Sequence, residues 1–220
     1  MIHTLAITKD SKLEKDLPLE KLNDTNIKWF WVDFDCPTTK ESELLHTHFH
    51  FHKLAIEDCL HNLQRAKLDY YEGYSFFVLH SLNEKTLSPE EADMFMSEKF
   101  IVSFHNTHLS EFDEVWEKIS TPESALNEGS IYIGYHILDE IVDHYFPAVY
   151  NLENLIDGIG DSLSKDSMDK VFEIRSDLLK LRRIVNQMRD LIYRVLNSTH
   201  LEEVKNNRVY FEIGRASCRE

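Results

Sequence analysis

The 220-residue chain has the composition of an ordinary globular protein, with 42% hydrophobic and 29% charged residues. Its formal net charge is −15, and residues 1–133 alone hold 24 acidic and 12 basic residues. A nucleic-acid-binding face needs clustered Lys and Arg to neutralise phosphates, so this balance argues against a DNA or RNA partner. An acidic surface is compatible with cations as partners, although many acidic surfaces serve only to keep a protein in solution.

The cysteines and the hydropathy pattern restrict the class of protein further. Cys36, Cys59 and Cys218 are an odd number with no CxxC spacing, which argues against a disulfide framework and a thiolate zinc site and favours a reducing compartment. No signal peptide is visible, and no stretch approaches the ~18–20 apolar residues that span a bilayer. We therefore expect the chain as given to be soluble.

The first 125 residues alternate between predicted strands and helices. A threonine cap at Thr38 or Thr39 predicts a helix that runs to about Phe49. Residues 68–82, rich in aromatic residues and valine, predict one long buried strand. The other segments read by the same rules are strands at 2–8, 27–34, 92–97 and 99–105 and helices at 53–61 and 110–119.

From Ser130 onward the hydrophobic period is that of a helix. Apolar residues three or four apart predict one helix from Ser130 to about Leu163, and a second helix runs from Asp166 to about Asn197. The short connection predicts an antiparallel hairpin, and a third helix begins near Leu201.

The predicted fold class is therefore α+β, an α/β/α-like mixed sheet flanked by helices, followed by long antiparallel helices that lead to a stalk. The expected domains are residues 1–125 for the mixed α/β part and residues 126–212 for the hairpin and the start of the stalk helix. Residues 213–220 have no apolar period and are interpreted as a vector-derived tail.

The run from His46 to His52 is the pattern most typical of a transition-metal site. On a helix, His46 and His50 would form an i,i+4 pair suited to Zn²⁺, Ni²⁺ or Co²⁺, but no third ligand is evident. Partly exposed histidines without a metal are the alternative. The chain has no GxSxG, P-loop, GxGxxG or HExxH motif, so it is predicted not to be an enzyme.

Three motifs in order carry a family resemblance. The window His52–His80 contains Glu57-Asp58 and Gln64-Arg65 ahead of an aromatic segment; Trp31-Val32-Asp33 precedes it and residues 135–146 (YHILDEIVDHYF) follow it. With these motifs the chain resembles the cytoplasmic domain of the CorA family of magnesium and cobalt transporters over most of residues 27–211. Lys53 and Ala66 stand where the family pattern has proline, which changes turn geometry without removing a ligand.

The resemblance implies a homopentamer in which divalent ions bind between subunits and hold the channel closed. It assigns Asp58, with contributions from Glu57 and Asp139, to one half of a Mg²⁺-sensing site whose other half lies on the stalk. Oxygen ligands from one or two carboxylates suit Mg²⁺. Co²⁺, Ni²⁺ and Zn²⁺ are alternative ions.

The resemblance also implies that the natural protein continues past about residue 212 with two transmembrane helices and a Gly-Met-Asn signature. We expect the full-length protein in the cell membrane, this portion in the cytoplasm, and the fragment as a monomer or weak oligomer. Three alternatives remain open. They are a zinc transporter of the same superfamily, a metal-dependent hydrolase that uses the histidine run with Glu57 and Asp58, and a helical scaffold whose long hairpin only binds partners.

Overall fold

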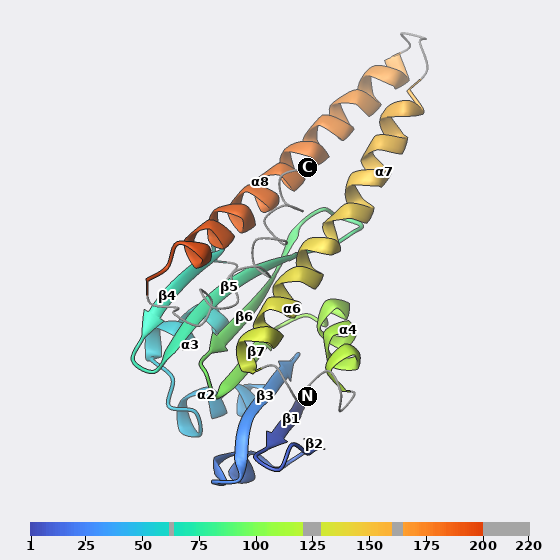
Figure 1. Cartoon of the computed structure of the whole chain (residues 1–220). Helices are drawn as coiled ribbons and strands as arrows, with labels where there is room; N and C mark the ends of the chain where they lie inside the picture. The colour runs from blue at the N-terminus through green and yellow to red at the C-terminus, as the bar shows by residue number, and fades with distance from the viewer. Residues whose placement is uncertain (62–63, 121–128, 160–164, 200–220) are drawn as a thin grey trace.

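A mixed β-sheet lies between two layers of helices, and a helical hairpin projects beyond it (Figure 1). The computed structural model describes residues 1–61, 64–120, 129–159 and 165–199. Within these ranges, no helix is both long enough and apolar enough to cross a bilayer. The predicted third helix near Leu201 and the tail at 213–220 lie outside the described residues.

Seven strands form one sheet in the order β2-β1-β3-β7-β6-β5-β4. The β3–β7 pair is parallel and every other neighbouring pair is antiparallel. In chain order the strands are β1 Ile2–Thr8, β2 Leu13–Lys15, β3 Ile27–Asp35, β4 Lys67–Tyr71, β5 Tyr74–Leu82, β6 Pro89–Met96 and β7 Phe100–His105.

The helices follow from local capping and amphipathic patterning. Thr38 forms a capping box with Glu41 at the start of the helix Thr39–Ser42 (α1), which satisfies two backbone donors that have no helical partner. The described helices are η1 Leu19–Asn23, α1 Thr39–Ser42, α2 Leu44–Thr47, α3 Lys53–Leu60, α4 Ser110–Ile119, α6 Ser130–Asp143, α7 Tyr145–Asp157 and α8 Lys165–Leu196. The helix predicted to reach Phe49 is thus two short helices that end at Thr47.

Side chains alternate between the two faces of the sheet and build a core on each. On one face, Leu79 and Met94 pack with residues of α4, α6 and α8 such as Ile137. On the other face, Phe95 packs with Ala55 and Cys59 of α3 and with α2. Helices thus cover both faces of a mixed sheet, which confirms the predicted fold class. The first core joins the sheet and the long helices in one apolar cluster.

The single strand predicted for residues 68–82 is wrong. The chain turns back at Glu72-Gly73, so that β4 and β5 form an antiparallel hairpin in which Tyr71 pairs with Tyr74. Gly73 has φ +84°, a left-handed conformation that a residue with a Cβ adopts only at a cost. The aromatic pattern on both sides of Gly73 concealed this turn.

The continuous helix predicted from Ser130 is also interrupted. It is divided at His144, which ends α6 and precedes α7. Pro147 explains the break, because it has no N–H to donate to the carbonyl of Asp143 and its ring collides with that carbonyl in a regular helix. The joint between α6 and α7 therefore lies one turn before the proline.

Candidate metal site

The predicted pair Glu57 and Asp58 lies on α3. Ala55 and Cys59 bury one face of this helix against the sheet, so Glu57 is exposed and Asp58 is only partly buried. Asp58 Oδ2 accepts a hydrogen bond from Lys67 Nζ at 2.7 Å, and the same ammonium lies 2.9 Å from Asp69. Partial burial opposes charge on Lys67, but these two carboxylates raise its pKa above the usual value. Asp58 therefore already has a cationic partner within its own chain.

Asp139 lies on the opposite side of the sheet. It belongs to α6, whose apolar face joins the other core, whereas α3 joins the core that contains Phe95. Burial raises the pKa of Asp139, and Tyr135 hydrogen-bonds to its carboxylate. The sheet and its two buried cores lie between these helices, so one ion cannot contact Asp58 and Asp139 of the same chain. The structure does not bring the three predicted carboxylates together.

The histidine run does not continue a helix through its length. His50 has φ +55° and lies beyond the end of α2, so His46 and His50 are not an i,i+4 pair on one helix. The Nδ1 atom of His50 is 3.1 Å from the backbone carbonyl oxygen of His46, to which it can donate. Both imidazoles are exposed. A metal at this pair stays a prediction.

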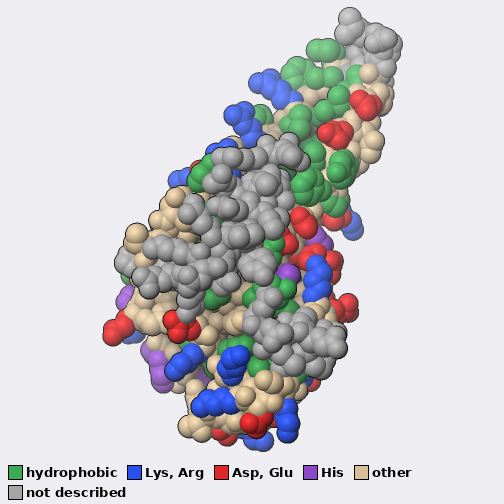
Figure 2. Space-filling view, in the orientation of Figure 1, with side chains coloured by type: hydrophobic (Ala, Val, Ile, Leu, Met, Phe, Trp, Pro, Cys, Tyr) green, Lys and Arg blue, Asp and Glu red, His purple; other side chains and the backbone are tan. Residues whose placement is uncertain are grey.

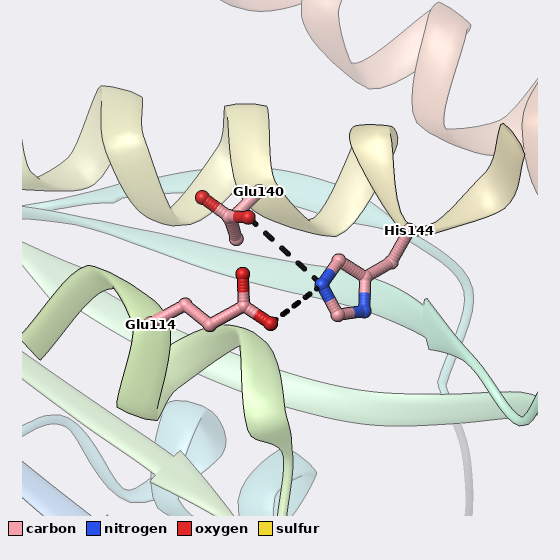
Figure 3. A group of neighbouring side chains, drawn as sticks. All are labelled: Glu114, Glu140 and His144. Carbon is pink, nitrogen blue, oxygen red and sulfur yellow. Dashed lines mark hydrogen bonds and ion pairs between the residues drawn. The ribbon is translucent and has the colours of Figure 1, made fainter. Parts of the chain in front are cut away.

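Three other side chains do converge at metal-binding separations. Glu114 of α4, Glu140 of α6 and His144 at the α6–α7 joint each offer a ligand atom within 4.8 Å of the other two (Figure 3). His144 Nε2 lies 3.1 Å from Glu114 Oε1 and 3.9 Å from Glu140 Oε1. Of the residues that the structure describes, no other His, Cys, Asp and Glu side chains form such a group.

Helix packing places each member of this group. In α4, Phe112, Val115 and Ile119 are buried, which turns Glu114 toward α6 and solvent. Glu140 is the most enclosed of the three, with 10% of its side chain exposed, compared with 22% for His144 and 47% for Glu114. The site is therefore open to water on the α4 side and closed on the α6 side.

The charges around the group are unevenly balanced. Lys118 of α4 pairs with Glu140 Oε2, which leaves Oε1 facing His144. Burial alone would raise the pKa of Glu140, but Lys118 and a hydrogen bond with Glu114 hold it below its usual value. That same hydrogen bond is the main reason that the pKa of Glu114 is raised. Two adjacent carboxyl groups thus compete for one proton or one cation.

Sequence reasoning missed this group for an identifiable reason. Glu140 and His144 are four residues apart on a predicted helix, so their proximity was readable from spacing. Glu114 comes from another helix 26 residues earlier in the chain, and only the packing of α4 against α6 brings it to them.

A second polar cluster lies at the carboxyl ends of the parallel strands β3 and β7. His105 is buried, with Nε2 3.3 Å from Asp33 Oδ1 and Nδ1 3.5 Å from Asp35 Oδ1. The exposed His108 ring lies between Asp35 and Asp113. Its Nδ1 is 3.1 Å from Asp35 Oδ2, and its Nε2 is 3.1 Å from Asp113 Oδ2. Carboxylates and imidazoles therefore alternate from the core to the surface. Because protonation of an imidazole between carboxylates is favoured, this cluster responds to pH.

Comparison with known proteins places the chain in a family. The model of CorA-like Mg²⁺ transporter proteins matches residues 26–216. YfjQ of Bacillus subtilis (strain 168), a protein named for metal ion transport, is 43% identical over 215 residues, which are 96% of this chain and 67% of YfjQ. The cobalt/magnesium transport protein CorA of Thermotoga maritima is 24% identical over 153 residues, which are 66% of this chain and 44% of that protein.

The fold also matches a solved structure. The soluble domain of CorA from Methanocaldococcus jannaschii superimposes with a TM-score of 0.81 at 17% sequence identity, over 99% of this chain and 88% of that one. At this identity the likeness concerns the fold. It extends over the sheet and the helical hairpin alike.

Proposed function

The chain belongs to the family of CorA-like Mg²⁺ transporter proteins, and from that premise we propose that it is the cytoplasmic, ion-sensing part of a divalent-cation channel or transporter in the cell membrane. In this proposal Mg²⁺ binds between neighbouring subunits of a homopentamer, through Glu57 and Asp58 of one subunit, Asp139 of the next and the stalk, and favours the closed state. Mg²⁺ and Co²⁺ are the proposed transported ions. Transport is passive and involves no covalent chemistry, in keeping with a family of transporters rather than enzymes.

The placement of the carboxylates on opposite sides of the sheet carries this proposal. In a closed ring each subunit meets its neighbours through two different surfaces, so residues on opposite sides of one chain can face each other across an interface. Carboxylates from two subunits repel one another until a dication lies between them. An ion bound there stabilises the arrangement of subunits in which the carboxylates are close together.

Lys67 indicates how such a site could remain weak. A Mg²⁺ ion at Asp58 must either displace the ammonium from Oδ2 or use the other carboxylate oxygen. Mg²⁺ retains several waters and needs only one or two protein carboxylates, so the second arrangement is chemically reasonable. A weak site suits a sensor of an abundant ion, because the site empties when the ion becomes scarce. The ion shifts the equilibrium only by its differential affinity for the two states.

Exposed apolar side chains on the helical hairpin support assembly with further protein. Figure 2 shows hydrophobic side chains along the part of the hairpin that projects beyond the sheet. Those with more than two fifths of their surface exposed are Tyr150, Leu155, Ile156, Met168, Val171, Phe172, Leu178 and Leu179. A contiguous apolar surface of this kind is typical of interaction sites.

Ion flux through the full-length protein tests the proposal. The protein is reconstituted in liposomes, and flux is measured as Mg²⁺ rises on the cytoplasmic side. We expect Asp58→Asn to conduct at Mg²⁺ concentrations that close the wild type. Asp69→Asn is a matched control, because Asp69 contacts the same Lys67 but has no part in the proposed site. Closure of Asp58→Asn at the wild-type Mg²⁺ concentration would contradict the proposal.

A further inference from the structure

The geometry points to a second ion site, formed by Glu114, Glu140 and His144, that takes a divalent transition metal such as Co²⁺ or Zn²⁺ rather than Mg²⁺. This site lies within one chain, at the place where α4 contacts the α6–α7 joint (Figure 3). It goes beyond the proposed function, since it requires no second subunit and no transport.

The separations of the ligand atoms fit an ion of this size. Metal–nitrogen and metal–oxygen bonds of about 2.0–2.2 Å place neighbouring ligand atoms about 3.0–3.5 Å apart in octahedral or tetrahedral geometry. The Nε2–Oε1 distance from His144 to Glu114 is 3.1 Å, and that to Glu140 is 3.9 Å. The wider separation is the one between His144 and Glu140, so a small shift of either side chain closes the set around an ion. Three protein ligands leave at least one position for water.

The imidazole determines the class of ion. Nitrogen ligands suit Zn²⁺, Co²⁺ and Ni²⁺, whereas Mg²⁺ and Ca²⁺ prefer oxygen ligands alone. The Glu111 carboxylate is buried and has its Oε1 4.0 Å from His144 Nδ1, on the side of the ring away from Glu114 and Glu140. At 4.0 Å this contact is electrostatic rather than a hydrogen bond, and the nearby negative charge favours the tautomer with the proton on Nδ1, which leaves Nε2 to bind the ion. Ser81 donates a hydrogen bond to Glu111 and holds it in place.

Lys118 limits the charge of the site without occupying it. Its ammonium pairs with Glu140 Oε2, on the oxygen that does not face His144. The two glutamates and the lysine together carry one negative charge when ionised, and a dication changes this to one positive charge. The site therefore needs no additional acidic group, and the exposed edge of Glu114 provides access for the ion.

The position of the site couples metal binding to the hairpin. His144 is the residue at which the long helix is interrupted, and α4 is anchored in the sheet core by Phe112 and Val115. An ion held by ligands from both sides would fix the direction in which α7 leaves the sheet domain. The ion would thereby fix the hairpin relative to the sheet.

Co²⁺ binding to the 220-residue chain tests this inference. The measurement is done in a background that carries His46→Ala and His50→Ala, so that the histidine run cannot contribute. We expect about one equivalent of Co²⁺, detected by calorimetry and by its visible absorption, and no displacement by millimolar Mg²⁺. His144→Ala and Glu114→Gln should each weaken binding about tenfold or more. Glu117→Gln, an exposed carboxylate one turn further along α4, should leave it unchanged.

Three results would overturn the inference. These are Co²⁺ binding that is lost in the His46→Ala/His50→Ala background itself, binding that is unaffected by His144→Ala and Glu114→Gln, and displacement of Co²⁺ by millimolar Mg²⁺. Far-UV circular dichroism of each variant separates loss of a ligand from loss of the fold. Because this assay uses a single chain without a membrane, its failure leaves the proposed Mg²⁺ response of the full-length protein intact.

Discussion

At the scale of single residues, buried polar groups determine how the stability of the fold depends on pH. His105 is the clearest case, since it is buried between Asp33 and Asp35 and donates from Nδ1 to the Thr107 carbonyl 2.7 Å away. Burial alone would lower the pKa of His105, but the Asp33 carboxylate raises it, and the Thr107 carbonyl and Asp35 add to the effect. From the α4 side, the Phe112 ring packs on the imidazole.

This cluster predicts a pH dependence of stability. Because the pKa of His105 is raised in the folded state, its protonation stabilises the fold below the pKa of an unfolded histidine, about 6.5. That contribution is lost as pH rises through the raised folded-state value. We expect Asp33→Asn to lose more of the free energy of unfolding at pH 6 than at pH 8, measured by denaturant titration against the wild type.

Comparison with the wild type is essential in this experiment. His80 and His136 have lowered pKa values, through burial, and give the opposite pH dependence in both proteins. An NMR titration of His105 provides an independent check, and its pKa should fall in Asp33→Asn. An equal loss of stability at both pH values would show that His105 does not titrate as described.

At the scale of elements, turns and helix interruptions were the features that the sequence pattern predicted least well. Helix α4 and strand β1 could be read directly, because each has one clear period between clear boundaries. The β4–β5 turn was concealed, because aromatic residues suit both strands and Gly73 gives no signal of the turn beyond its own presence. The joint at His144 was readable in principle from Pro147. The meeting of Glu114 with Glu140 and His144 was not readable, because it depends on how two helices pack.

The β4–β5 turn gives a prediction about stability. Gly73→Ala places a Cβ at φ +84° and should destabilise the fold by about 1–2 kcal/mol, although nothing lies within 4 Å of that Cβ. Gly158→Ala is the matched control, because Gly158 has φ −73° at the end of α7 and should tolerate alanine with little change. Chemical denaturation measures both variants. Equal stability of the two would show that backbone strain at Gly73 is not the cause.

Close packing between α6 and the sheet gives a second prediction about stability. At Gly134 of α6 a Cβ would lie 2.7 Å from Met96 Sδ of β6, so this helix rests on the sheet through a residue without a side chain. Gly134→Leu should destabilise the chain by about 1–3 kcal/mol through overpacking. Gly134→Ala should cost less, because the flexible Met96 side chain can move. Thermal unfolding of both variants distinguishes this order from its reverse.

At the scale of the whole molecule, family and fold could be predicted from the sequence, whereas the arrangement of the site could not. The motifs around Glu57-Asp58 and residues 135–146 identified the family, which the family model and the relatives confirm. The same motifs did not reveal that Asp58 and Asp139 lie on opposite sides of the sheet, because residue spacing carries no information on which face a distant helix covers. This separation leads to the central claim, that the Mg²⁺ site is completed between subunits.

Mixed oligomers of two full-length variants test that claim most directly. Asp58→Asn and Asp139→Asn subunits, each with its own affinity tag, are co-assembled, purified through both tags and compared with each variant alone for inhibition of flux by Mg²⁺. Any mixed ring contains at least one interface with Asp58 from one subunit and Asp139 from the next, so we expect part of the wild-type Mg²⁺ response to return. If the site were complete within one chain, no response would return, because neither kind of subunit carries both residues. A mixed oligomer as unresponsive to Mg²⁺ as the single variants would contradict the account.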